Sequence, residues 1–309
     1  MYDLMIVGGG PAALAAAFYA QSKRLNAVII YDELGGKTAW QHNRSNHEEV
    51  NQLPGNEVVE QLVKRVSQPD QHLVHIHDRA NDVIPTDKGF AVTTERNGRI
   101  YARALIVATG ANPKRLDVPG VQHLLGQGLG YSLTTFAHQV AGQRVAVIGA
   151  TPRTFRGIAE MLGSAQHIYL ITPYDGLPES SMTLALHRSP QLDVLTHAKV
   201  RDILGFNSAR CVVIETGEEI KQIQVDRVFV DLGLQPNTRF VQEIGITDSD
   251  GFILVDEFNA TSIRGLYAAG DVTTSIFGEQ VLIAIGDGVR AAVSAYEYIL
   301  TEKLHEVAA

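Results

Sequence analysis

The fold of this chain is decided by residues 2–13, which read YDLMIVGGGPAA. The apolar residues before the glycines predict a buried strand of a parallel sheet, and the Ala-rich stretch after them predicts a helix that tolerates Pro11 in its first turn. Gly8 permits the tight turn between them, and Gly10 lets a pyrophosphate approach the backbone. Ala13 lets the helix pack closely on the strand. Because the start of such a helix binds phosphate oxygens, this stretch predicts a dinucleotide site.

A second stretch repeats this pattern in the middle of the chain. Residues 145–154 read VAVIGATPRT, again a strand, a turn and the start of a helix. Here Thr151 puts a branched side chain where the backbone should approach a pyrophosphate, and Thr154 enlarges the contact between helix and strand. The chain therefore contains two related dinucleotide motifs, of which the second is eroded.

Shorter signals extend both motifs into larger units. Asp32 ends the second predicted strand, at a place where an acid accepts hydrogen bonds from ribose hydroxyls. Asn97-Gly98 and Thr216-Gly217 each lie between two strand-like runs and predict two hairpins, one after each motif. The two halves of the chain thus share one order of elements.

The end of each half repeats as well, because Ala108-Thr109-Gly110 is mirrored by Asp231-Leu232-Gly233. We therefore predict an α/β fold with two Rossmann-like dinucleotide-binding domains. The first domain is expected to comprise residues 1–116 and 244–309, and the second to be inserted at 117–243.

Composition and charge restrict the class of protein. The chain has 309 residues, of which 45% are hydrophobic and 19% charged, as in ordinary globular proteins. A net charge of −8 argues against a nucleic-acid partner, and no apolar run is long enough to span a bilayer. Because the first residues already form the predicted strand, we expect no signal peptide and a cytoplasmic protein. Cys211 is the single cysteine, which excludes an intramolecular disulfide and a CxxC centre.

With these motifs the chain resembles the low-molecular-weight thioredoxin reductases, a family of FAD flavoproteins. Further stretches carry the resemblance in the family's order: its Gly-Gly-Gln loop, its Asn-x-Pro-Gly loop, its Ala-Thr-Gly motif and its C-terminal Gly-Asp motif. The corresponding residues are Gly35-Gly36-Lys37, Gln52-Leu53-Pro54-Gly55, Ala108-Thr109-Gly110, and Gly270-Asp271-Val272 with Glu279-Gln280-Val281. The resemblance covers nearly the whole chain.

The resemblance implies that the first domain binds FAD. Asp271 would hold the ribityl chain, and a helix starting near Gln280 would direct its positive end toward the flavin edge that carries negative charge after reduction. The predicted cofactor-binding residues are Gly8, Gly10, Pro11, Ala13, Asp32, Gly35, Gly36, Lys37, Gln52, Pro54, Ala108, Thr109, Gly110, Gly270, Asp271, Glu279, Gln280 and Val281. No metal site is predicted, and catalytic side chains are left unassigned.

The chain departs from the family pattern at the flavin loops. Lys37, Gln52 and Glu279 stand where the family has Gln, Asn and Arg. The loop after Lys37 is also longer than the family's and carries three basic side chains, His42, Arg44 and His47. We interpret this loop as a solvated polar segment, with a partner or substrate contact as the alternative.

The redox-active dithiol of the family is missing from the sequence. Ser132 and Thr135 stand where the family has two cysteines, and Phe136 replaces the acid that would protonate the thiolate. Disulfide exchange needs thiolates, so hydroxyls cannot perform it. The sequence therefore excludes disulfide reduction by the family mechanism. We assign a packing role to Tyr131 in this segment, and expect Cys211 to be a small buried residue.

The family's contacts to the 2′-phosphate of NADPH are missing too. Thr172-Pro173-Tyr174 carries no positive charge where the family has His-Arg-Arg, and an arginine pair that binds phosphate has no neutral substitute. Strong, NADPH-selective binding is therefore not expected. Arg153 and Arg156, at the start of the second helix, remain open between anion binding and plain solvation.

Three interpretations of function remain open. In the first, FAD receives electrons from a ferredoxin-like protein, or from a second FAD in the eroded motif with Tyr169 and Tyr174 as stacking groups. In the second, the chain is an NAD(P)H-dependent flavin reductase that binds nicotinamide weakly and resembles thioredoxin-reductase-type ferredoxin–NADP reductases. In the third, it is a non-catalytic flavin-binding sensor or interaction module.

We favour the first interpretation. It describes an FAD-dependent oxidoreductase without a redox-active disulfide, which exchanges electrons with a small redox protein or a small molecule and takes them from a donor other than NADPH. A homodimer is expected from the resemblance and from the frequency of two-fold assemblies. One fixed domain orientation is expected, because there is no dithiol that would need alternating access to the flavin.

Overall fold

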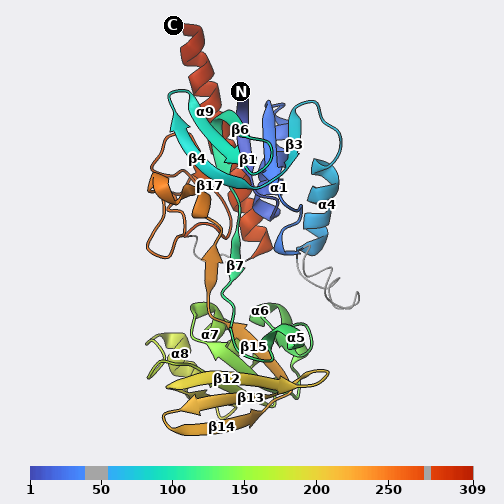
Figure 1. The fold of residues 1–309 in the computed structure, drawn as a ribbon, viewed down its shortest axis with the longest axis vertical. Helices are drawn as coiled ribbons and strands as arrows, with labels where there is room; N and C mark the ends of the chain where they lie inside the picture. The colour runs from blue at the N-terminus through green and yellow to red at the C-terminus, as the bar shows by residue number, and fades with distance from the viewer. Residues whose placement is uncertain (39–54, 275–279, 309) are drawn as a thin grey trace. The chain divides into compact units, whose positions relative to one another are not determined.

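The structure is a computed structural model that describes residues 1–38, 55–274 and 280–308. These residues form two compact units, Met1–Asn112 with Gln235–Ala309, and Pro113–Leu234 (Figure 1). The inserted unit thus ends before residue 243, the boundary expected from the sequence. The reason is the 3₁₀ helix η2 (Arg239–Ile244), whose Val241 is buried in the core of the first unit.

The first unit is built on a mostly parallel sheet. Its described strands follow the order β3-β2-β1-β6-β5-β4, and β17 also pairs with β6. Strands β3, β2, β1, β6 and β17 pair in parallel, whereas β5 and β4 extend the sheet in antiparallel fashion. The bounds are β1 (Tyr2–Val7), β2 (Ala27–Tyr31), β3 (Leu73–His77), β4 (Ala80–Thr86), β5 (Gly89–Thr94), β6 (Arg99–Val107) and β17 (Leu266–Ala268).

Both faces of this sheet are covered, which explains the uninterrupted apolar run Leu4 to Val7 of β1. Leu4 and Ile6 pack into one core cluster, whereas Met5 and Val7 pack into the other. The first cluster includes residues of three helices, α1 (Pro11–Ser22), α4 (Asn56–Val66) and α9 (Val281–Ala308). The strand predicted at residues 2–7 and the helix that follows it are thereby confirmed.

Helices α1 and α9 approach each other closely because small residues line their contact. A Cβ added to Gly288 of α9 would clash with the carbonyl oxygen of Ala12 in α1. Ala291, Ala292 and Ala295 continue the buried face of α9. The long C-terminal helix predicted from about Gln280 is confirmed, and its packing on α1 holds its start against the first glycine motif.

The second unit repeats the arrangement on a smaller scale. A parallel sheet has the strand order β11-β10-β9-β15-β8, and a separate antiparallel sheet has the order β12-β13-β14. The strands are β8 (Leu129–Gly130), β9 (Arg144–Gly149), β10 (His167–Ile171), β11 (Leu192–Leu195), β12 (Ala198–Gly205), β13 (Ala209–Thr216), β14 (Glu219–Gln224) and β15 (Arg227–Asp231). The helical segments are α5 (Val121–Leu124), α6 (Leu133–Phe136), η1 (Ala137–Gln139), α7 (Pro152–Met161) and α8 (Ser181–Leu186).

Both predicted hairpins are confirmed. The β5–β6 hairpin turns at Gly98 with a φ of 70°, and the β13–β14 hairpin turns at Gly217 with a φ of 62°. Two short strands, β7 (Ala111–Pro113) and β16 (Leu234–Pro236), pair where the chain passes between the units. Among the described helices, none combines the length and the apolar character needed to cross a membrane.

Candidate nucleotide sites

The glycine turn after β1 is locked against two neighbouring backbone segments. Gly8 has a φ of 133°, and a Cβ at this position would clash with the carbonyl oxygen of Ala108 at the end of β6. A Cβ on Gly9 would clash with the carbonyl oxygen of Glu33 in the loop after β2. Because only glycine fits both positions, the turn fixes the start of α1 at the carboxyl edge of the parallel strands.

The start of α1 is open. Gly10 is the N-cap residue, and among the described residues no side chain caps the helix. A Cβ on Gly10 would meet no described atom within 4 Å, although Gly36 borders the opening so closely that its own Cβ would lie 2.9 Å from Gly10 Cα. An uncapped helix start presents backbone N–H groups and partial positive charge to an incoming anion. This geometry fits a dinucleotide pyrophosphate.

Asp32, the predicted ribose acceptor, lies directly after β2. Arg79, in the turn between β3 and β4, donates a hydrogen bond to its carboxylate. This hydrogen bond is the main cause that lowers the pKa of Asp32 below its usual value. The carboxylate therefore remains ionised and able to accept hydrogen bonds from hydroxyl groups at neutral pH. No sequence pattern pointed to Arg79 as its partner.

Lys37 and Asp271 form an ion pair that sequence analysis did not anticipate. Lys37 Nζ lies 2.5 Å from Asp271 Oδ2, although 234 positions separate the two residues in the chain. The side chain of Asp271 is 11% exposed and that of Lys37 is 35% exposed. A neutral glutamine, which the family has in place of Lys37, would provide no charge here. The pair thus brings a cation to the acid that is predicted to hold the ribityl chain.

The C-terminal motif lies against the first turn of α1. A Cβ on Gly270 would lie 3.0 Å from the Cβ of Ala12, so Asp271 follows directly beside the open helix start. At the start of α9, Val281 contacts the end of another predicted loop, because a Cβ on Gly55 would lie 2.9 Å from Val281 Cγ1. Predicted site residues from distant parts of the first unit are therefore brought together.

The remaining predicted residues have separate positions. Gly35 donates its N–H to the carbonyl of Gly9 at 2.8 Å, and Thr109 Oγ1 donates to the carbonyl of Asn237 at 2.8 Å. Gly110 has a φ of 67° and open space beside it. The exposed Gln280 accepts the first helical hydrogen bond of α9 from Ala284. Pro11 and Ala13 lie in the first turn of α1, and Ala13 is buried. Gln52, Pro54 and Glu279 lie outside the described residues, together with His42, Arg44 and His47.

Asp287 is a buried acid near this region that sequence analysis missed. It lies on α9, and its Oδ1 accepts a hydrogen bond from Arg290 Nη1 at 3.2 Å. Its Oδ2 is buried and has no hydrogen-bond partner among the described residues. Burial raises the pKa of Asp287 above its usual value. An acid within the small-residue run Ala284 to Ala292 is the signal that could have identified it.

The second motif repeats the turn geometry of the first. Gly149 has a φ of 143°, and a Cβ there would clash with the carbonyl oxygen of Asp231 at the end of β15. Gly149 and Asp231 therefore have the same relation as Gly8 and Ala108. The position of a buried alanine in the first motif is occupied by an acid in the second.

The start of α7 is closed by its own side chains. Thr151 Oγ1 accepts a hydrogen bond from the backbone N–H of Thr154 at 3.1 Å, and Thr154 Oγ1 accepts one from the N–H of Thr151 at 3.1 Å. This reciprocal capping box satisfies N–H groups that a pyrophosphate would otherwise use. Pro152, between them, has no N–H. The erosion predicted from Thr151 and Thr154 thus has a specific form, a capped helix start.

Asp231 completes the closure. Its carboxylate is fully buried and accepts hydrogen bonds from Thr151 Oγ1 at 2.9 Å, from Thr154 Oγ1 at 3.0 Å and from Arg153 Nε at 3.0 Å. Burial alone would raise the pKa of Asp231, but the hydrogen bond and charge of Arg153 hold it below its usual value. Arg153 is therefore neither a solvated surface cation nor open to an external anion, because it binds an internal carboxylate.

The segment that replaces the family's dithiol is part of the second unit. Ser132 Oγ donates a hydrogen bond to Thr135 Oγ1 at 2.5 Å. Tyr131 packs on the core of this unit, and its hydroxyl accepts a hydrogen bond from the N–H of Leu116 at 3.2 Å, which agrees with the predicted packing role. Cys211 is buried as predicted, and burial raises the pKa of its thiol. No described thiol is thus available beside the two hydroxyls.

The two tyrosines considered for stacking differ in exposure. Tyr169 is half-buried, with its ring 4.8 Å from that of His167, and Tyr174 is 63% exposed. Their role toward a second flavin stays a prediction. Within the described ranges, no group of three or more His, Cys, Asp or Glu side chains could hold a metal ion.

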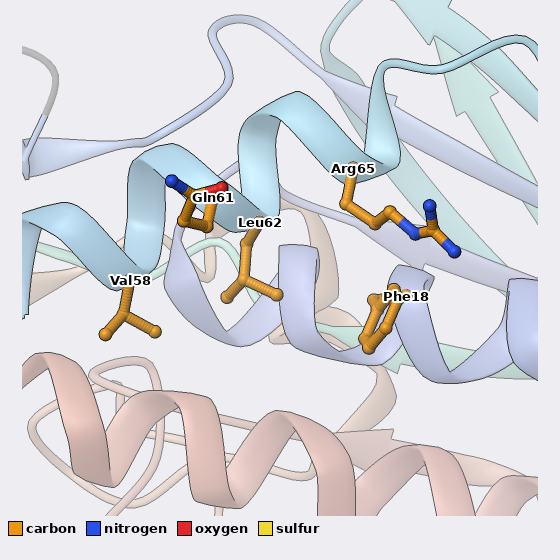
Figure 2. A pocket seen from close by; sticks show the side chains of 5 residues that line it. All are labelled: Phe18, Val58, Gln61, Leu62 and Arg65. Atoms are coloured by element: carbon orange, nitrogen blue, oxygen red, sulfur yellow. The ribbon is translucent and has the colours of Figure 1, made fainter.

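A hollow on the first unit lies apart from the predicted cofactor residues. Figure 2 shows it between α1 and α4, lined by Phe18, Val58, Gln61, Leu62 and Arg65. None of these residues belongs to a glycine motif or to the motif around Asp271. The open start of α1 is therefore the better candidate for the cofactor.

Comparison with known proteins assigns the chain to a family. Residues 2–296 match the family described as Pyridine nucleotide-disulphide oxidoreductase. The chain belongs to this family. The match extends over both units, so it includes the open first motif and the capped second motif of this pyridine nucleotide-disulphide oxidoreductase.

Relatives and solved structures agree with this assignment. The F component of alkyl hydroperoxide reductase is 30% identical over 302 residues in Staphylococcus epidermidis and 31% identical over 303 residues in Staphylococcus aureus. Each match covers 97% of this chain but 59% of the relative, so the chain spans about three fifths of their length. Thioredoxin reductase from Streptococcus pyogenes has a TM-score of 0.81 at 25% identity, over 97% of this chain and 99% of that chain. Thioredoxin reductase from Giardia duodenalis, at 20% identity, a TM-score of 0.81 and the same coverage, shows the fold alone.

These findings confirm the predicted fold class, a mixed α/β architecture with two Rossmann-like domains of the thioredoxin reductase type. They also confirm the resemblance on which the predicted cofactor rests. This member of the pyridine nucleotide-disulphide oxidoreductases is an FAD-dependent oxidoreductase.

Proposed function

We propose that this chain transfers electrons through bound FAD without a dithiol of its own. The observation that carries the proposal is the hydroxyl pair of Ser132 and Thr135, whose oxygens lie 2.5 Å apart at the place of the family's dithiol. Neither hydroxyl can take up electrons by disulfide exchange. Cys211, the single thiol of the chain, is buried in β13. Electrons would therefore pass from the flavin to an external acceptor without a thiol relay in this chain.

The first unit fits FAD. The open start of α1 beside Gly10 would hold the pyrophosphate, and Asp32 would accept hydrogen bonds from the adenosine ribose. Asp271 would hold the ribityl chain, with the ammonium group of Lys37 beside it. Bound FAD supplies the capacity to accept and release electrons, and these residues place it and set its electrostatic surroundings.

We further propose that NADPH is not the electron donor. The start of α7 is capped by Thr151 and Thr154, and residues 172–174 offer no cation for a 2′-phosphate. A small redox protein of the ferredoxin type is the donor that we favour. A second FAD in the inserted unit is an alternative that the capped start of α7 disfavours, because FAD also carries a pyrophosphate. Weak use of NADH is the competing interpretation.

An anaerobic titration tests the donor. FAD-loaded protein should keep its flavin absorbance band near ~450 nm when stoichiometric NADPH or NADH is added, and lose it fully with dithionite. Rapid loss of the band with NADPH would refute the proposal. Flavin released from denatured protein should also be counted, because one FAD per chain would argue against the second flavin and two would support it.

Two further measurements test the acceptor and the assembly. Dithionite-reduced protein should reoxidise quickly with ferricyanide, which accepts single electrons, and slowly with a small aromatic disulfide. Fast, stoichiometric reduction of the disulfide would contradict transfer without a dithiol. We also expect a homodimer, so light scattering should give twice the chain mass of 33.6 kDa.

A further inference from the structure

The two motifs of this chain provide an internal comparison. Val7 pairs with Val107 in the first unit, and Gly149 pairs with Asp231 in the second. Ala108 directly follows Val107, the last residue of β6, and Asp231 is the last residue of β15, and their carbonyl oxygens lie over the equivalent glycines Gly8 and Gly149. At this position the first motif has the methyl side chain of an alanine, and the second has the carboxylate of an aspartate.

The carboxylate of Asp231 is connected to the positive end of α7. Thr151 Oγ1 and Thr154 Oγ1 each donate to Asp231 Oδ2, at 2.9 Å and 3.0 Å. Each hydroxyl also accepts a backbone N–H from the helix start, at 3.1 Å. Each of these two backbone N–H groups is thus connected to the Asp231 carboxylate through one threonine hydroxyl. The positive end of α7 therefore already interacts with an anion, which is this carboxylate.

Arg153 adds the positive charge that this anion requires. Its Nε donates to Asp231 Oδ2 at 3.0 Å, and a terminal nitrogen donates to Oδ1, so the guanidinium and the carboxylate meet along two parallel bonds. The arginine side chain is 18% exposed and the carboxylate is 0% exposed. Such a two-pronged pair is the geometry in which arginine also binds phosphate groups.

These donors are the ones that a dinucleotide pyrophosphate would need. A helix start and an arginine side chain are the usual means of holding phosphate oxygens. Here both serve an internal carboxylate. A pyrophosphate would have to displace this carboxylate from its partners or place its own negative charge beside it. Either event is unfavourable, because a buried charge without its partners is costly and like charges repel.

We propose that Asp231 is a specificity-determining residue that excludes dinucleotides from the second motif by acting as a built-in anion at the start of α7. This inference rests on the proposed function, whose donor is not NADPH, and deepens it by naming the residue responsible. Removal of the carboxylate should free Arg153 and the helix start for an external phosphate.

Calorimetric titration with ADP-ribose tests the inference, since this probe carries a pyrophosphate but cannot donate electrons. The protein is loaded with FAD beforehand so that the first motif is filled. Asp231→Ala introduces the residue type of the first motif, and Asp231→Asn keeps the side-chain shape. Asp226→Asn is the matched control, because Asp226 forms a similar ion pair with Arg144, 3.2 Å apart, at the opposite end of β15.

Wild type and Asp226→Asn should show no binding at millimolar ADP-ribose. The Asp231 variants should bind with a Kd at least about tenfold below the highest ADP-ribose concentration tested, which corresponds to a gain of at least about 1.4 kcal/mol. Folded Asp231 variants without this gain would overturn the inference and leave the donor proposal intact. Loss of the flavin band with NADPH would instead refute the donor proposal, whatever the variants bind.

Wild-type protein alone also provides a test if the variants do not fold. Hydrogen exchange at the first turn of α7 should be the same with and without ADP-ribose, because the probe finds no free donors there. Protection of the Thr154 amide by ADP-ribose would overturn the inference.

Discussion

Replacing Gly10 by alanine should separate FAD binding from folding. Gly10 has a φ of −77° and a ψ of −177°, an extended conformation that alanine adopts without strain. The added methyl group would meet no described atom within 4 Å. Gly8, by contrast, has a φ of 133°, and the Cβ of Gly8→Ala would clash with the carbonyl oxygen of Ala108. Two glycines of the same turn should therefore respond differently.

The magnitudes follow from these surroundings. Without FAD, Gly10→Ala should leave the free energy of unfolding unchanged or raise it by about 0.4–1 kcal/mol, because alanine reduces the entropy of the unfolded chain. With FAD, the methyl group would separate the pyrophosphate from the backbone. A hydrogen bond to a charged group is worth about 1.5–3 kcal/mol. Its loss should raise the Kd for FAD by about 10- to 150-fold.

The assay combines thermal unfolding of the apoprotein with titration of FAD, followed by quenching of flavin fluorescence. Gly176→Ala is the matched control, since Gly176 is exposed, has no atom within 4 Å of an added Cβ and lies in the other unit. It should change neither quantity. An unchanged Kd in Gly10→Ala would refute the assignment of the open helix start to the pyrophosphate, and loss of folding would refute the claim of free space.

The double substitution Ser132→Cys with Thr135→Cys should create a pair of thiols that dissolved oxygen oxidises to a disulfide, because the hydroxyl oxygens already lie 2.5 Å apart. Thiol titration before and after reduction measures the disulfide, and equal thiol counts would contradict the expectation. Asp231→Asn should weaken the decrease of the free energy of unfolding at acid pH. The wild-type carboxylate has a lowered pKa, so it stabilises the fold above its unfolded pKa of about 3.9 and loses this effect as the pH falls through the lower folded value. Thermal unfolding from neutral pH to about pH 3 compares the two proteins, and identical profiles would contradict the expectation. On α9, Gly288→Ala should destabilise by more than about 2 kcal/mol, because its Cβ would clash with a carbonyl oxygen of α1. Gly286→Ala, which has open space, should instead stabilise by about 0.5–1 kcal/mol, and urea unfolding should rank them in this order.

Local patterns predicted the framework of both units because their physical causes are local. A doubly buried strand needs an unbroken apolar run, as in Leu4 to Val7, and a turn under a neighbouring carbonyl needs glycine, as at Gly8 and Gly149. Asn97-Gly98 places a hairpin by its own conformational preference. The duplication of these patterns was therefore visible without knowledge of any long-range contact.

Pairings between distant side chains could not be predicted in the same way. The sequence singled out Lys37 and Asp271, but their ion pair depends on how separate loops of the first unit fold together. The role of Arg153 stayed open because its partner, Asp231, lies 78 positions away. An acid that ends the apolar strand Arg227–Asp231 was the available signal, since a charge there requires a partner.

Asn237 connects the two segments of the first unit that flank the inserted unit. Asn237 donates its N–H to the carbonyl of Gly110 at 2.9 Å and its Nδ2 to the carbonyl of Thr109 at 2.9 Å, while its Oδ1 accepts from Asn112 Nδ2 at 2.9 Å. These hydrogen bonds hold the segment that precedes the inserted unit and the segment that follows it side by side. We call this group of hydrogen bonds the Asn237 clamp. A recombination event with both breakpoints at this clamp would exchange the inserted unit as one cassette and leave the strand order of the first unit unchanged. The unit that we propose to hold the flavin and the unit with the capped motif can then evolve at different rates within one gene.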